Sequence, residues 1–189
     1  MQKFSLLALV TIIAAPAQAQ DRVKLSELQG RMVHGKIMTE RVMRKGGRQF
    51  PVKTKMDWKL KVQKGDAVWQ EVRQTVTNPR GTRETDPLTR TFPLGKPVTV
   101  GSRGGGEAMY SFSDGTLTFV RTFKKGAFRM STEFARGGDG KLTCVMTGSH
   151  AREEGTGAVE LVNPFDGQPM SIVSYKQVSS SCEVAADKS

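Results

Sequence analysis

Residues 50–63 read FPVKTKMDWKLKVQ, and the polarity of their side chains alternates along the stretch. The even positions are mainly apolar: Phe50, Val52, Thr54, Met56, Trp58, Leu60 and Val62. The odd positions after Pro51 are charged or polar: Lys53, Lys55, Asp57, Lys59, Lys61 and Gln63. Because successive side chains of a strand point to opposite faces, this alternation predicts a β-strand with one apolar face and one lysine-rich face.

Similar strand patterns recur along the chain, separated by turn residues, and none shows a sustained helical period. The predicted strands are residues 31–44, 49–63, 67–77, 107–112, 116–123, 127–135, 141–149 and 170–178, with a further short strand at 158–162. Many short strands with Gly-rich turns are typical of β-sandwiches and β-barrels. We therefore predict an all-β fold, an antiparallel up-and-down meander of about eight strands that forms a closed or nearly closed barrel.

Lipocalin-like barrels have this layout. The Leu28-x-Gly30 lead-in, within a segment expected to be a short helix or extended, is faintly similar to the start of such barrels, although Met32 stands where they usually carry tryptophan. The lipocalin-like layout is an analogy of geometry only, and it implies no function because one fold can serve many functions.

The register of the first three strands follows from their charges. A two-residue turn at 46–47 and a three-residue turn at 64–66 place opposite charges across from each other and keep the apolar residues on one face. The predicted facing pairs are Lys36–Asp57, Glu40–Lys53, Gly35–Trp58, Lys59–Glu71 and Asp57–Arg73. A slip by one residue would move every side chain to the wrong face.

The segment from 78 to 106 is expected to be a long irregular loop, rich in proline and glycine, with Phe92 and Leu94 anchoring it to the core. Long loops of this kind are often lids or binding loops. The hairpin signal Asp114-Gly115 then predicts a second meander, with Phe112 opposite Leu117 and Tyr110 opposite Phe119. The next turn is expected to place Phe123 opposite Phe128.

The N-terminus has the pattern of a secretory signal peptide at residues 1–19: a positive start, an apolar run, and a small-x-small cleavage site ending at Ala19. Residues 20–189 then form a single β-barrel or β-sandwich domain, since their length suits one domain. Cys144 and Cys182 are expected to form a disulfide, worth about 4 kcal/mol in a chain-entropy model. The protein is predicted to be periplasmic or secreted, with no transmembrane segment after cleavage.

The formal net charge of +11 favours an anionic partner such as a polysaccharide or a lipid surface. The alternative is that the lysines only keep the protein in solution and protect sheet edges. The predicted cross-strand charge pairs leave few lysines and arginines of the outward face without an acidic partner. The candidate binding residues there are Lys55, Lys61, Trp69 and Arg73. Nucleic acid is not an expected partner, because one exposed aromatic residue is too few for base stacking.

The inward face offers a second set of candidates: Arg41, Arg121, Gln70 and Gln74. Polar side chains of this kind are costly in a dry core unless they find partners. If the barrel holds a cavity, they could orient the acidic head of an apolar ligand. The alternative is that both arginines lie at the barrel mouths and extend their charges into water.

The sequence shows no pattern for catalysis or for a cofactor. It has two histidines, and His150 follows Ser149 directly, so that the two side chains of a strand would point apart. The methionines could suit copper(I), but the predicted register separates the Met–His and Met–Trp pairs onto opposite faces, which favours core packing. We therefore expect a protein that is not an enzyme and carries no metal or cofactor.

Three functional hypotheses remain. The first is a binding protein for an anionic component of the cell envelope, through the lysine-rich face. The second is a carrier of a small apolar ligand with an acidic head group, held in the barrel. The third is a purely structural envelope protein.

Overall fold

The computed structural model describes residues 22–100, 106–123, 125–151, 159–162 and 168–187. The predicted signal peptide lies outside these residues. These residues form one short helix, α1 (Leu25–Leu28), followed by antiparallel β-strands. The prediction of an all-β antiparallel fold is confirmed. No helix among the described residues is long and apolar enough to cross a membrane.

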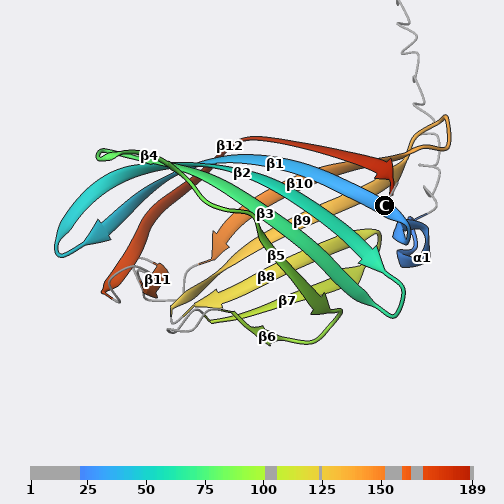
Figure 1. The fold of residues 1–189 in the computed structure, drawn as a ribbon, viewed down its shortest axis with the longest axis horizontal. Coiled ribbons are helices and arrows are strands. Elements are labelled where there is room, and N and C mark those ends of the chain that lie inside the picture. The colour runs from blue at the N-terminus through green and yellow to red at the C-terminus, as the bar shows by residue number, and fades with distance from the viewer. Residues whose placement is uncertain (1–21, 101–105, 124, 152–158, 163–167, 188–189) are drawn as a thin grey trace, which may run out of the picture.

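The strands form two sheets (Figure 1). The first sheet contains β1 (Arg31–Lys45), β2 (Arg48–Gln63), β3 (Ala67–Asn78), β4 (Gly81–Glu84), β5 (Leu88–Pro93), β11 (Val159–Val162) and β12 (Pro169–Ala186). Its order is β11-β12-β1-β2-β3-β4, and β5 also pairs with β3. The second sheet contains β6 (Val98–Thr99), β7 (Glu107–Ser113), β8 (Thr116–Phe123), β9 (Gly126–Arg136) and β10 (Leu142–Ala151), in the order β10-β9-β8-β7-β6.

The predicted register of β1, β2 and β3 is confirmed. Gly35 faces Trp58, and Glu40 faces Lys53, as the two-residue turn requires. Lys59 faces Glu71 across the next turn. Lys36–Asp57 and Asp57–Arg73 are also facing pairs. Alternating burial along β2 confirms that its apolar side chains point into the core and its lysines point outward.

Two local predictions are wrong. The segment from 78 to 106 is not wholly irregular, because β4, β5 and β6 lie within it, and β5 continues the first sheet along β3. At the turn between β8 and β9, Phe123 pairs with Gly126, and Phe128 lies opposite Arg121. The predicted register was therefore shifted by two residues, which leaves every side chain on its original face.

The core lies between the two sheets, where the long strands of the first arch over the second (Figure 1). Trp58 from β2 and Phe92 from β5 contact Phe119 from β8, and Tyr110 from β7 completes this aromatic cluster. Phe92 is buried, and Leu94 packs against the core, so both predicted anchors of the 78–106 segment are confirmed. Phe112–Leu117 and Tyr110–Phe119 pair as predicted.

The predicted barrel is not confirmed, because neither sheet closes on itself. The last strand does pair with the first, as closure of an up-and-down meander requires, and it does so beyond its predicted end at residue 178. The two sheets approach one another where β10 runs beside β12. This boundary, the β10–β12 seam, has no backbone ladder in the described residues.

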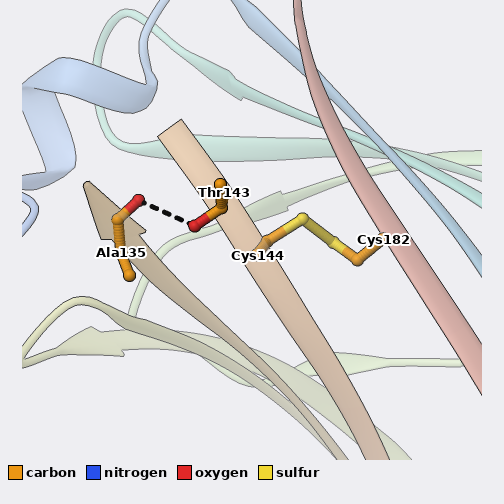
Figure 2. The surroundings of a disulfide bond; sticks show 4 residues. All are labelled: Ala135, Thr143, Cys144 and Cys182. Atoms are coloured by element: carbon orange, nitrogen blue, oxygen red, sulfur yellow. Dashed lines mark hydrogen bonds between the residues drawn. A yellow bond between two sulfur atoms is a disulfide. The ribbon is translucent and has the colours of Figure 1, made fainter. Parts of the chain in front are cut away.

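A disulfide between Cys144 and Cys182 crosses the β10–β12 seam, as Figure 2 shows, and confirms the predicted bond. The two Cα atoms are 5.6 Å apart. Farther along the seam, the backbone N–H of Gly148 donates a hydrogen bond to Oε1 of Gln177, 2.5 Å away. Covalent and side-chain contacts therefore hold together two strands that the backbone does not join.

Candidate functional site

The lysine-rich face is mostly neutralised. The Nζ atom of Lys53 lies 2.9 Å from the Glu40 carboxylate, and that of Lys59 lies 3.1 Å from Glu71. Lys61 was predicted to have no acidic partner, but it forms an ion pair with Asp187 just after β12. That prediction is wrong because the last strand reaches farther along β1 than its pattern indicated.

The other outward candidates do not form a shared site. Lys55 is exposed on β2. Trp69 is half-buried between Lys61 and Thr91 of the two neighbouring strands, so it is not the exposed aromatic residue that was predicted. Arg73 borders a hollow of about 280 Å³ that also contains Glu84 and Asp86, whose charges oppose anion binding.

Gln70, Gln74 and Arg121, three of the four inward candidates, make the following contacts inside the protein. Gln70 is buried and accepts a hydrogen bond from the Tyr110 hydroxyl at 2.5 Å. The backbone N–H of Gln74 donates to Oγ1 of Thr85. The guanidinium of Arg121 lies 5.3 Å from the centroid of the Phe123 ring, a cation–π arrangement. The side-chain contacts of Gln70 and Arg121 favour a structural role for these two residues, whereas the Gln74 contact involves only its backbone.

Arg41 is different, because it brings a charge into the interior without an acidic partner. It lies on β1 opposite Tyr175 of β12 and donates a hydrogen bond to Oγ1 of Thr54. Its Nε atom is buried and has no hydrogen-bond partner. Within the described part of the chain no carboxylate pairs with it, and burial lowers its pKa. Arg41 is half-buried, and a guanidinium that loses part of its hydration without an acidic partner is costly in a folded protein.

A pocket of about 320 Å³ lies between β10, β11 and β12, and it is lined by Tyr175, the residue opposite Arg41 on β12, but not by Arg41 itself. The pocket's lining residues are Gly148, Ser149, His150, Val159, Ile172, Ser174, Tyr175 and Gln177. The rings of His150 and Tyr175 lie 4.5 Å apart, measured between centroids. A methyl group added at Gly148 would lie 2.9 Å from the Tyr175 hydroxyl oxygen, so the glycine leaves room for this side chain.

Two polar atoms of the pocket residues have no hydrogen-bond partner. They are Nδ1 of His150 and the hydroxyl oxygen of Tyr175, and both are buried. Buried polar groups in folded proteins are nearly always hydrogen-bonded, so unsatisfied groups that gather in one place require an explanation. Together with Nε of Arg41, they form what we call the Arg41 cluster: Arg41, His150 and Tyr175.

The electrostatics of the Arg41 cluster disfavour any further positive charge. Burial, with a smaller contribution from the Arg41 charge, lowers the pKa of His150 to about 4. Burial raises the pKa of Tyr175, and Arg41 opposes that rise in part. At neutral pH the cluster therefore carries one positive charge beside a neutral imidazole and a neutral phenol, both of which can donate hydrogen bonds.

The pKa of His150 leads to a prediction about acid stability. Between pH 6.5 and about 4 the unfolded state binds a proton at this histidine and the folded state does not. The stabilisation from His150 is therefore complete above pH 6.5 and is lost as the pH falls towards 4, a change of about 3 kcal/mol. Urea unfolding at pH 7 and pH 4.5 should show a markedly smaller pH effect for His150→Gln than for the wild type.

His34→Gln is the matched control, because His34 is exposed on β1. Acidic groups whose pKa values are lowered by ion pairs, such as Glu40, contribute equally to all three proteins and cancel in the comparison. If His150→Gln and the wild type lose equal stability between the two pH values, the buried neutral state of His150 is wrong.

Of the sequence-based site residues, only Arg41 belongs to this site. His150 had been considered only as a catalytic base, and Tyr175 had no predicted role. The sequence contains a partial signal that His150 lies on the side of the disulfide. Cys144 and His150 are an even number of residues apart on one strand, so their side chains share a face. Tyr175 and Cys182 are an odd number apart, and an irregularity at residues 177–179 of β12 brings them to the same face.

Among the described residues, no three His, Cys, Asp or Glu side chains gather closely enough to hold a metal ion. The site is thus a pocket of mainly polar lining, with one half-buried cation beside Tyr175 and two enclosed polar atoms that lack hydrogen-bond partners. Comparison of the chain with protein-family models, with curated proteins and with solved structures finds no match to any of them.

Proposed function

We propose that this protein is an exported, non-enzymatic binding protein for a ligand with an acidic group, which binds in the pocket of the Arg41 cluster. The observation that carries the proposal is the charge of Arg41, which is half-buried, has an enclosed Nε atom without a hydrogen-bond partner, and has no acidic partner in the described residues. An anionic ligand in the pocket would place a counter-charge near Arg41. It could accept hydrogen bonds from Nδ1 of His150 and the Tyr175 hydroxyl only after these side chains turn, because both atoms are enclosed.

Among the three hypotheses from the sequence, this choice is nearest to the second, a carrier of a small ligand with an acidic head group, but the pocket lies at the β10–β12 seam and not inside a closed barrel. Binding through the lysine-rich face has less support, because three of its lysines already form ion pairs. A purely structural role gives no reason for a half-buried cation that has no acidic partner in the described residues. Export is supported by the signal-peptide pattern at residues 1–19 and by the disulfide, which is typical of oxidising compartments.

The test is binding of small anions to the wild type and to Arg41→Met. Acetate, hexanoate and inorganic phosphate serve as probes, and the NMR signals of the His150 imidazole report on binding. We expect at least one anion to shift these signals, and Arg41→Met to weaken its binding tenfold or more, as expected for loss of a charge-assisted interaction. Because the arginine is costly to bury, Arg41→Met should unfold at the same or a higher temperature than the wild type.

Lys55→Met is the matched control, since it removes one positive charge from the outward face and leaves the pocket intact. Its affinity for the anions should equal that of the wild type. The proposal is wrong if none of the three anions binds in a manner that depends on Arg41, or if Lys55→Met weakens binding as much as Arg41→Met does.

A further inference from the structure

Two hairpins, β1–β2 and β3–β4, turn at the end of the molecule that lies opposite α1 (Figure 1). They are neighbours in the first sheet, because Lys53 of β2 pairs with Thr77 near the end of β3. Residues 48–52 of β2 have no partner on β3, so the first hairpin extends past the second. The turn residues 46–47 and 79–81 are all exposed. This end of the sheet is therefore accessible to a large partner.

The tips of these hairpins carry cations without matching acids. The sequence from 41 to 55 contains six lysines and arginines and no aspartate or glutamate. Within the part of the chain that the structure describes, Arg44, Arg48 and Arg80 form no ion pair, and all three are exposed. We use the name basic tips for the cations of both hairpin ends: Arg44, Lys45, Arg48, Arg80 and Arg83.

The pairing of charges changes at the first tip. Farther along the same two strands opposite charges face each other, as Glu40 and Lys53 do, but at the tip Lys45 faces Arg48. Like charges placed directly opposite each other destabilise a strand pair, so the tip is not arranged for the stability of the hairpin. Nor does protection of the open edge require these cations, because Pro51, which has no N–H, already interrupts that edge.

Several of the cations near α1, by contrast, have acidic partners. The ion pairs around α1 and the neighbouring turns include Arg22–Asp114, Arg136–Glu27 and Lys61–Asp187. The charges of this end are thus partly balanced within the protein. The two ends of the molecule therefore differ in charge, and the basic tips form the positive end.

We infer that the basic tips dock the protein on an anionic lipid bilayer. The cations are spread over two separate tips and do not converge on one pocket, so they match a plane of many negative headgroups better than one small anion. The pocket beside Tyr175 is lined by other residues, so this inference is independent of the proposed function. It also differs from binding through the lysine-rich face, where Lys53 and Lys59 already have acidic partners.

A bilayer fits this end of the molecule better than an anionic polymer does. Chain-like polyanions bind along positively charged grooves, and nucleic acids add stacking on exposed aromatic rings. The hollow next to the second tip contains Glu84 and Asp86, which repel a polyanion. Phe50, an aromatic residue near the first tip, is half-buried and is not free to stack. A flat surface can touch the tips without entering the hollow.

The experiment is cosedimentation of the processed protein, residues 20–189, with phosphatidylcholine vesicles that contain or lack an equal part of phosphatidylglycerol. Binding should require the anionic lipid and fall steeply as salt is added, because salt screens exposed charges. Arg44→Gln and Arg48→Gln together should weaken binding roughly 25-fold, about fivefold for each cation removed from the surface. Both arginines are exposed, so this tip variant should keep the wild-type unfolding temperature.

The matched control is Lys64→Gln combined with Lys96→Gln. It removes the same net charge from two exposed positions away from the tips, since Lys64 lies in the turn at the other end of β2 and Lys96 follows β5. The control should weaken vesicle binding by less than about threefold, because screening limits the attraction of distant charges. Heparin and duplex DNA, tested with the same proteins in solution, serve as the polymeric anions.

Four results would contradict the inference. The wild type could fail to bind the anionic vesicles, or it could bind neutral vesicles equally well. Equal losses for the tip variant and the control would mean that net charge attracts the protein and that the tips are not the docking surface. If the tip variant loses affinity for heparin or DNA while the wild type leaves the vesicles unbound, the tips bind a polymer and the bilayer is wrong.

Discussion

Replacing Phe119 by alanine is expected to lower the free energy of unfolding by about 4 kcal/mol. Phe119 is 5% exposed and lies at the centre of the aromatic cluster. Its ring centroid is 4.9 Å from that of Tyr110, 5.6 Å from Trp58 and 6.0 Å from Phe92. Because Trp58 and Phe92 belong to the first sheet and Phe119 to the second, the substitution opens a cavity where the two sheets meet.

Urea unfolding at pH 7, followed by circular dichroism, measures this loss. Phe50→Ala is the matched control, because Phe50 is half-buried at the margin of a small hydrophobic cluster formed by Met43, Val52, Val159 and Ile172. It should cost less than half as much as Phe119→Ala, since less apolar surface is lost. Equal losses for the two variants would mean that the aromatic cluster is not the centre of the core.

Removing the disulfide with Cys144→Ala and Cys182→Ala together is expected to lower the free energy of unfolding by about 4 kcal/mol. The bond closes a loop with a sequence separation of 38 residues. It also crosses the β10–β12 seam, where no backbone ladder joins the strands in the described residues. The double variant should therefore lose anion binding as well, because His150 is on β10 and Tyr175 is on β12.

The disulfide effect is measured by urea unfolding with and without a dithiol reductant. Reduced wild type should match the double variant, and the reductant should leave the double variant unchanged. A loss of less than 1 kcal/mol on reduction would contradict the prediction. If stability fell as expected but anion binding persisted, the disulfide would stabilise the fold without shaping the pocket.

The region that could be predicted best is the sheet from β1 to β3. Its two turns are short, so their lengths limit the choice of register, and the pairs Glu40–Lys53 and Lys59–Glu71 select one alignment. A slip by one residue would expose the apolar face, and the sequence itself excludes it. The hairpin pairing Tyr110 with Phe119 was predictable for the same reason.

Other features could not be predicted, because the alternation of apolar and polar residues fits more than one register or pairing. The position of Phe123 opposite Gly126 differs from the predicted one by two residues, and both registers have the same faces. The pairing of β5 with β3 joins a segment of mixed composition to a strand that already pairs with β2 and β4. Hydrogen bonds between backbones carry no side-chain signature, so the sequence pattern contains no sign of this contact.

The candidate site also has some features that the sequence predicts and others that it does not. The sequence by itself determined that Arg41 points inward, because it lies an even number of residues from the apolar Val33 and Ile37 on one strand. It also determined the disulfide partners, since the chain contains only two cysteines. Alternation and cysteine count are local or numerical properties, and neither depends on how the sheets meet.

Only the tertiary structure decided that Arg41, His150 and Tyr175 form one cluster. Irregularities in the β1–β12 pairing shift the alternation of β12, so that Tyr175 turns to the same side as Cys182. The approach of β10 to β12 then brings His150 against Tyr175. Both events depend on the curvature and packing of two complete sheets, which long-range contacts set and which no single stretch of sequence specifies.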